Sequence, residues 1–265
     1  VFTGVPWLAI GYSQVDSPLA GFAPVLGVYG VSFATVLCAG LLVAALAGDR
    51  RVRITCGAAL VAVVGVGAAL KAIAWTSPQG EPVRVALLQG NISQDLKFQA
   101  ERYAKTLAIY RRLIEIGNAK LIVLPETAIP RFLDAVDPGY LRDIARVATE
   151  RNADVLIGVP IRDRDGRYFN SVVSLGVSPT QRYDKSHLVP FGEFVPPGLR
   201  WMVKALSIPL SDFSSGPGNA RPLAVAGQLV APNICWEDAF GEEIIRALPE
   251  ATLLVNFSNV AWVGD

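Results

Sequence analysis

The sequence predicts an α/β domain that follows a hairpin of two transmembrane helices. Of its 265 residues, 52% are hydrophobic, and the mean hydropathy of +0.39 is higher than is usual for a soluble domain. The apolar residues gather near the N-terminus, where residues 18–48 carry no charge. From residue 82 onward, short apolar runs alternate with amphipathic stretches, which is the pattern of a sheet covered by helices.

Two apolar runs predict the membrane hairpin. Residues 18–48 exceed the roughly 20 residues that cross a bilayer core of about 30 Å. Residues 54–75 form a second run, interrupted only by Lys71. The alternative is a pair of buried helices in a large soluble protein, and uncharged stretches of this length disfavour it. Residues 1–17 contain proline and aromatic side chains, so we expect an interfacial loop segment there.

Arginines between the two runs predict the orientation of the hairpin. Arg50, Arg51 and Arg53 fall in the expected loop between the spans. Positive charge in a short loop favours the cytoplasmic side, so both ends of the hairpin are expected outside the cytoplasm. Lys71 and Trp75 suit the outer membrane–water interface. The sequence therefore predicts a multi-pass membrane protein whose following domain is extracytoplasmic.

One α/β domain is expected over residues 82–265, after a linker of turn-forming residues at 76–82. Apolar periodicity and turn residues define its elements. The expected strands are residues 83–89, 120–124, 154–159, 168–176, 180–184, 228–234 and 252–257. The expected helices are residues 98–116, 140–149, 199–206 and 242–248.

Charge and cysteine content exclude several classes of protein. The formal net charge is +1, which gives no indication of nucleic acid as a partner. The three cysteines are Cys38, Cys56 and Cys235, and two of them lie in apolar runs, so a disulfide framework is not expected. With one histidine and no Cys/His cluster, a zinc site is not expected either.

Cys235 is a candidate nucleophile because it lies between an apolar strand and a helix-like stretch. The strand fixes such a cysteine in place, and a helix N-terminus stabilises its thiolate. The alternative is a buried structural thiol, since free cysteine usually behaves as a small hydrophobe.

Two charged residues follow other strands. Glu126 comes after the apolar stretch 121–124, and ligands gather beyond the carboxyl ends of strands in α/β sheets. Burial raises the pKa of a glutamate, which suits a general base, although a solvated loop acid is the commoner case. Lys185 ends another strand, where it would stabilise a thiolate and an oxyanion, or remain a surface charge. Glu193 lies in the loop after it and would hold Lys185 or orient the base, whereas His187 is expected to be structural.

Three segments carry a resemblance to a known family. Leu124-Pro125-Glu126, residues 183–193 and Ile234-Cys235-Trp236-Glu237 resemble the nitrilase (carbon–nitrogen hydrolase) superfamily. With the two membrane runs and residues 6–14 and 89–92, nearly the whole chain resembles the bacterial apolipoprotein N-acyltransferases of that superfamily.

The resemblance implies a nitrilase-like αββα sandwich outside the bacterial cell membrane. It implies transfer of a fatty acyl chain from a phospholipid, phosphatidylethanolamine for example, to the α-amino group of a diacylglyceryl-cysteine lipoprotein. Cys235 would form an acyl thioester, Glu126 would be the base, and Lys185 would stabilise the oxyanion with the backbone N–H of Trp236. No metal or organic cofactor is implied.

The resemblance also assigns supporting residues near the site. These are Glu193, Glu237, Trp236, Asn170, Phe98, Asn259 and Trp262. Phe98 stands where the family often has Trp, and Trp236 where Tyr is common. Val260 and Val263 replace an expected Asp and Phe. The resemblance further implies that the chain lacks the family's N-terminal spans and the C-terminal end of its nitrilase domain.

Two other functions remain open. A membrane-tethered nitrilase-type amidase would use the same triad but pass the acyl group to water. An acyltransferase needs an apolar mouth that faces the membrane, and the apolar side chains between residues 201 and 213 would line such a lid or form ordinary core. The other is a non-catalytic membrane scaffold, which is disfavoured because Cys235, Glu126 and Lys185 occur together.

Overall fold

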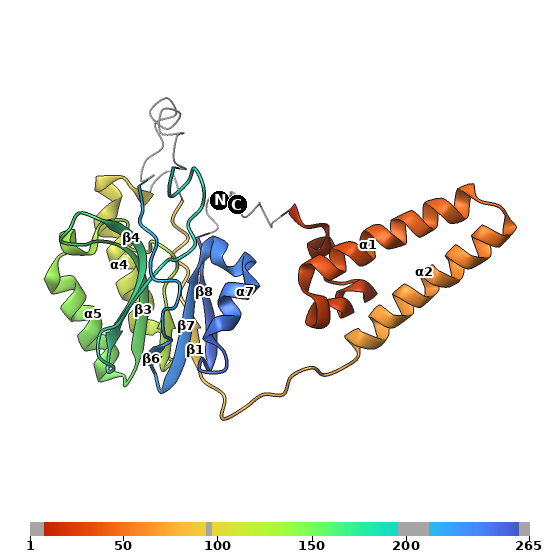
Figure 1. Cartoon of the computed structure of the whole chain (residues 1–265). Helices are drawn as coiled ribbons and strands as arrows, with labels where there is room; N and C mark the ends of the chain where they lie inside the picture. The colour runs from red at the N-terminus through yellow and green to blue at the C-terminus, as the bar shows by residue number, and fades with distance from the viewer. Residues whose placement is uncertain (1–7, 94–96, 196–211, 260–265) are drawn as a thin grey trace. The chain divides into compact units, whose positions relative to one another are not determined.

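The computed structural model describes residues 8–93, 97–195 and 212–259. The chain divides into two units, Val1–Glu81 and Pro82–Asp265 (Figure 1). The division falls inside the stretch of turn-forming residues at 76–82. The short helix expected at residues 199–206, and the apolar side chains of residues 201–211, lie outside the described residues.

The N-terminal unit is a helical hairpin with a short folded segment before it (Figure 1). Its elements are the 3₁₀-helices η2 (Ile10–Gln14) and η3 (Pro18–Phe22) and the helices α1 (Ala23–Ala47) and α2 (Arg50–Lys71). By length and apolar composition, Pro18–Ala47 and Arg50–Lys71 can each cross a membrane. Within the segment 1–17, expected to be an interfacial loop, residues 10–14 form the short 3₁₀-helix η2.

The arginines do not form a loop between the helices, contrary to expectation. They lie in the first turn of α2, so only Gly48 and Asp49 connect the two helices. The reason is a cap, because the Asp49 carboxylate accepts the backbone N–H of Val52 at 2.9 Å. The helix also ends at Lys71, earlier than the expected residue 75. There the Lys71 ammonium donates to the carbonyls of residues 15, 16 and 17 at 3.1–3.3 Å.

The second unit contains two sheets. The first has the order β1-β2-β3-β4-β5; β1, β2 and β3 are parallel, β4 is antiparallel to β3, and β5 is antiparallel to β4. The second has the order β6-β7-β8, with β6 antiparallel and β8 parallel to β7. The strands are β1 (Val85–Leu87), β2 (Leu121–Val123), β3 (Asp154–Arg162), β4 (Tyr168–Gly176), β5 (Arg182–Asp184), β6 (Leu223–Val225), β7 (Gln228–Ile234) and β8 (Leu253–Phe257).

Helices complete a four-layer αββα arrangement, as expected. The helices α4 (Ala100–Ile116) and α5 (Pro138–Glu150) pack on one face of the first sheet, and the second sheet packs on the other. Figure 1 shows the short helix α7 (Gly241–Ile244) beside β7 and β8, on the side away from the first sheet. The remaining short elements are the 3₁₀-helices η4 (Leu133–Ala135), η5 (Cys235–Ala239) and η6 (Ile245–Ala247).

Two hydrophobic cores separate these layers, and strand β2 contributes to both. Leu121 and Val123 lie in the core between the two sheets. Ile122 and Leu124 lie in the core between the first sheet and its helices. Alternate side chains of a strand point to opposite faces, so this fully apolar run is buried on both sides. The strand thereby fixes the position of the segment that follows it.

Most of the expected elements are present within a few residues of their expected bounds. Two differ. Strand β6 was not expected, and it pairs with β7 through Ala226 and Gly227, whose φ angles of 51° and 70° fit a type I′ turn. The helix expected at residues 242–248 is instead one α-helical turn, α7, followed by the 3₁₀-helix η6.

Candidate active site

Glu126 lies in a tight turn directly after β2. Its side chain is buried, and the next residue, Thr127, has a φ of 49°. The turn packs against Gly158 of β3, where an added Cβ would come within 2.3 Å of the Pro125 carbonyl oxygen and 2.8 Å of the Glu126 Cα. Only glycine fits so close to another backbone. The neighbouring strand therefore holds the Glu126 turn in place.

Lys185 follows β5 and is fully buried, with 1% of its surface exposed. Its backbone N–H donates to the Asn170 carbonyl at 2.8 Å, which continues the β4–β5 pairing by one residue. Its ammonium lies 2.8 Å from one Glu193 carboxylate oxygen and donates to the other at 3.0 Å. Burying an ammonium is costly unless it is paired and hydrogen-bonded, and Glu193 supplies both.

The loop that carries Glu193 is closed by its own hydrogen bonds. Glu193 Oε2 accepts the backbone N–H of Val189 at 2.9 Å, and the Phe191 N–H donates to the Phe194 carbonyl at 2.8 Å. Phe191 has a φ of 63°. Phe213 is the part of the expected lid that the structure describes, and its N–H donates to the Glu193 carbonyl at 2.9 Å.

Asn170 joins the two carboxylates. Its side-chain amide, assigned as the donor, reaches Glu126 Oε1 at 2.8 Å and Glu193 Oε1 at 2.9 Å. Glu126, Asn170, Glu193 and Lys185 thus form one hydrogen-bonded group. Their side chains come from the end of β2, from β4 and from the loop after β5, because the sheet brings those segments together.

Cys235 lies directly after β7 and begins η5, with a φ of 52°. This left-handed conformation is uncommon for a residue with a side chain, and such strain often occurs at functional sites. The Cys235 carbonyl accepts the Asn256 side-chain amide at 3.1 Å, and Asn256 also donates to Asn233 of β7. Neighbouring strands therefore hold the turn, and the thiol is half-buried.

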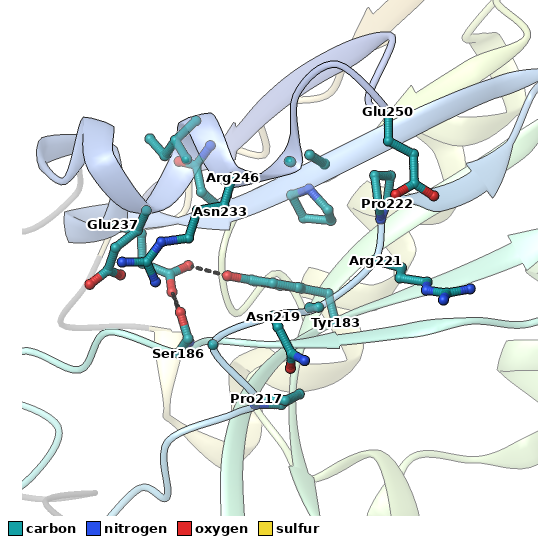
Figure 2. Close-up of a pocket in the computed structure, with 17 residues that line it drawn as sticks. Tyr183, Ser186, Pro217, Asn219, Arg221, Pro222, Asn233, Glu237, Arg246 and Glu250 are labelled. Atoms are coloured by element: carbon teal, nitrogen blue, oxygen red, sulfur yellow. Dashed lines mark hydrogen bonds between the residues drawn. The ribbon is translucent and has the colours of Figure 1, made fainter.

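Glu237 connects the cysteine turn to the lysine loop. Its carboxylate accepts five hydrogen bonds of 2.7–3.0 Å, from the N–H groups of Ile234, Ser186 and His187 and from the hydroxyls of Tyr183 and Ser186. Figure 2 shows the two hydroxyls directed at it, at the edge of a polar cavity of about 310 Å³. Glu126, Lys185 and Cys235 are not among the residues that line this cavity.

Burial controls the electrostatics of the thiol and its neighbouring acid. It raises the pKa of Cys235 to about 11, the Glu126 charge adds to this, and Lys185 and the Trp236 backbone N–H oppose it. Burial also raises the pKa of Glu126, against the effects of Lys185 and of the Asn170 hydrogen bond. For Lys185, burial acts against the charge, but Glu193 and Glu126 outweigh it and raise the pKa. The site therefore pairs a weakly acidic thiol with a carboxyl of increased basicity and a permanent cation.

The other expected site residues have varied positions. Trp236 is buried, and its ring lies 5.3 Å from that of Phe240, on which His187 stacks at 3.7 Å. Phe98 is 51% exposed, and Asn259 is half-buried just after β8. The hydrogen-bonded group around Glu126 includes neither of them. Trp262 lies outside the described residues, as do Val260 and Val263.

One buried residue at the site escaped the sequence analysis. Lys97, before α4, is 5% exposed, and its ammonium donates to the Glu126 carbonyl at 3.3 Å. Burial lowers its pKa to about 8, although the Glu126 charge acts in the opposite direction. Its position in the sequence gave no sign of this, because it stands directly before the helix expected at residues 98–116 and belongs to no apolar pattern. No group of three or more His, Cys, Asp or Glu in the described ranges is arranged to hold a metal ion.

This sandwich of two sheets has counterparts among known proteins. Residues 84–265 match the family model for carbon–nitrogen hydrolases, and the chain belongs to that family. Residues 1–41 match the N-terminal domain of apolipoprotein N-acyltransferases.

Relatives with that name match the whole chain. It is 50% identical to the apolipoprotein N-acyltransferase of Nitrosomonas europaea, covering 100% of this chain and 54% of the relative. It is 46% identical to that of Ralstonia nicotianae, covering 100% of this chain and 51% of the relative. The chain thus spans about half the length of these curated relatives. The C. elegans NitFhit protein shares the fold, with a TM-score of 0.51 and 17% identity over 66% of this chain and 43% of that one.

Proposed function

We propose that this chain carries the catalytic site of a membrane-bound N-acyltransferase that acts on lipoproteins. The observation behind the proposal is the group formed by Glu126, Asn170, Glu193 and Lys185, electrostatically coupled to Cys235. The similarity to apolipoprotein N-acyltransferases along the whole chain supports the choice of reaction within the carbon–nitrogen hydrolase family.

In the first half-reaction, Glu126 accepts the Cys235 thiol proton and the sulfur attacks an ester carbonyl of a phospholipid. The Lys185 ammonium and the Trp236 backbone N–H stabilise the oxyanion that forms on the carbonyl oxygen. The ester C–O bond then breaks, and Glu126 returns the proton to the departing alkoxide, which leaves as a lysophospholipid. The acyl chain remains on Cys235 as a thioester.

In the second half-reaction, the neutral α-amino group of a diacylated lipoprotein attacks the thioester. Glu126 takes a proton from the attacking nitrogen, and Lys185 again stabilises the oxyanion. The C–S bond breaks, an amide forms, and Glu126 reprotonates the sulfur. Phosphatidylethanolamine is the acyl donor that we propose.

The hairpin of α1 and α2 would anchor this site in the bacterial cell membrane. Its connecting end carries Arg50, Arg51 and Arg53, so the positive-inside rule supports a cytoplasmic location for that end. The domain after the hairpin is then extracytoplasmic. Labelling single cysteines introduced at residues 49 and 77 with an impermeant maleimide on intact cells tests this orientation. Labelling at residue 49 but not at 77 contradicts it.

Intact-mass spectrometry tests the chemistry. We expect a hydroxylamine-labile fatty-acyl adduct on the intact protein after incubation with phosphatidylethanolamine. The adduct should be absent from Cys235→Ala. It should be present on Cys56→Ala, the matched control, which removes another thiol and keeps Cys235. Addition of a diacylated lipopeptide should remove the adduct and produce a triacylated peptide. Rapid loss of the acyl chain to water, with no peptide product, indicates an amidase or esterase instead.

A further inference from the structure

A second buried lysine lies next to the proposed base. Lys97 and Lys185 approach Glu126 from different segments, one before α4 and one after β5. Lys185 pairs with the Glu193 carboxylate, whereas the hydrogen-bond acceptor of Lys97 is the backbone carbonyl of Glu126 at 3.3 Å. Lys97 is 5% exposed, so its charge has little access to water. A buried ammonium is costly, and the acceptor that the described residues supply to Lys97 is a neutral carbonyl.

Lys97 adds a positive charge to the group around Glu126. Among the described residues, Lys185 and Lys97 favour the ionised Glu126 carboxylate, Glu193 disfavours it, and Asn170 adds a neutral hydrogen bond. Without Lys97 less positive charge would offset these carboxylates away from water, and uptake of a proton would relieve them. Glu126 is the acceptor for that proton, because it is buried and the Glu193 charge disfavours its ionised form.

We propose that Lys97 is a positioning residue that keeps Glu126 ionised as the base for Cys235 and fixes the turn that carries it. The hydrogen bond to the Glu126 carbonyl acts on a turn that also contains the positive φ of Thr127. The cation acts on the carboxylate, and its effect on the Glu126 pKa is downward. This inference rests on the proposed role of Glu126.

The test is the pH dependence of Cys235 alkylation by iodoacetamide, which needs no lipid and no acceptor. The intact protein in detergent is used, and alkylation of Cys235 is followed by peptide mass spectrometry. Because alkylation requires the thiolate, its rate rises with pH as Glu126 becomes able to hold the thiol proton. Burial lowers the Lys97 pKa to about 8, so the comparison is made below pH 8, where Lys97 is charged. There we expect this rise in Lys97→Met at a pH about 1 unit higher than in the wild type, the lower end of the effect of a nearby opposite charge. Lys105→Met, which removes an exposed lysine of α4, should leave the profile unchanged.

Two further variants separate the charge from the hydrogen bond and guard against misfolding. Lys97→Gln keeps a donor without a charge and should show the same upward shift. Lys97→Arg keeps the charge and should match the wild type. A uniform drop in rate at all pH values, with no shift in any folded variant, overturns the proposal and leaves Lys97 a purely structural residue. Failure of phospholipid to acylate Cys235, with the alkylation shift present, would contradict the acyltransferase function and not the role of Lys97.

Discussion

The Glu237 carboxylate accepts the backbone N–H of Ser186 at 2.7 Å, although the two residues are 51 positions apart in the chain. Ser186 directly follows Lys185, and Glu237 lies two residues after Cys235. The same carboxylate accepts the Ile234 N–H at the end of β7. Glu237 therefore sets the distance between the cation and the nucleophile through the backbone, without taking part in the proposed chemistry.

Loss of the Glu237 charge should impair both stability and reactivity. Glu237→Gln keeps one acceptor oxygen and turns an NH₂ group toward N–H and O–H donors. Hydrogen bonds to charged groups contribute about 1.5–3 kcal/mol each, so we expect the free energy of unfolding to fall by roughly 3 kcal/mol. Thermal unfolding in detergent and the rate of Cys235 acylation measure the two effects. Glu242→Gln, at an exposed position of α7, is the control. An unchanged midpoint with normal acylation would show that Glu237 is dispensable.

Removal of the proposed base should leave a thiol that reacts only at high pH. The pKa of Cys235 is raised to about 11, chiefly by burial. A thiol with that pKa would be ionised in about one molecule in 10⁴ at pH 7. Glu126→Gln removes both the proton acceptor and the repulsive charge, but burial remains. We therefore expect alkylation by iodoacetamide to be slow at pH 7 and to rise tenfold per pH unit up to a midpoint between about 9 and 11.

Asn170→Ala is the matched variant for this experiment, because it removes the hydrogen bond to Glu126 and keeps the carboxylate. It should retain alkylation near neutral pH with a smaller rate. If Glu126→Gln reacts as fast as the wild type at pH 7, Glu126 is not the base.

Much of the site could be predicted because strand ends are visible in a sequence. The fully apolar run before Glu126 and the strand before Cys235 are each followed by a residue with a reactive side chain. The two strands belong to different sheets, which pack against each other through a shared core. The sandwich order followed from the resemblance, since periodicity alone does not say which sheet packs on which. The roles assigned to Glu126, Lys185 and Cys235, like those assigned to Phe98, Asn259 and Trp262, remain predictions.

What escaped prediction depends on contacts between distant segments. Lys97 has no local signature, because its burial comes from the turn that carries Glu126. Strand β6 has three residues, too few for a period, and exists because β7 pairs with it. The position of Arg50 in a helix instead of a loop follows from one hydrogen bond, between Asp49 and Val52. A capping aspartate before a run of arginines was the available signal.

The N-terminal unit offers a test of its close packing. An added Cβ on Gly21 would lie 1.9 Å from the Gly67 carbonyl oxygen, inside the backbone of α2. Gly21→Ala should therefore separate η3 from α2 and expose residues 8–22 to protease. Gly65→Ala is the matched control in α2, because a Cβ there meets nothing within 4 Å. It should resist protease as the wild type does. Equal cleavage of the two variants would contradict the packing of η3 on α2.

Asp154 should stabilise the packing of the two sheets through its hydrogen bonds. It begins β3 in the first sheet, is 2% exposed, and accepts the Ala226 N–H of the β6–β7 turn at 2.7 Å. It also accepts the N–H and hydroxyl of Ser178 at 2.8 and 2.6 Å. Asp154→Ala removes the charged acceptor of three hydrogen bonds from half-buried donors, and hydrogen bonds to charged groups contribute about 1.5–3 kcal/mol each when intact, so we expect a loss of roughly 3 kcal/mol.

Unfolding of the second unit in denaturant, followed by tryptophan fluorescence, measures this loss. Asp165→Ala is the control. Asp165 is an exposed turn residue whose salt bridge with Arg167 is solvated, so we expect little change in the free energy of unfolding. The acylation site should be intact in folded Asp154→Ala, because Asp154 lies at the amino end of β3, at the opposite end from the strand ends that carry Glu126 and Cys235. A fall in acylation larger than the unfolded fraction explains would show that the hydrogen bonds of Asp154 also position the site.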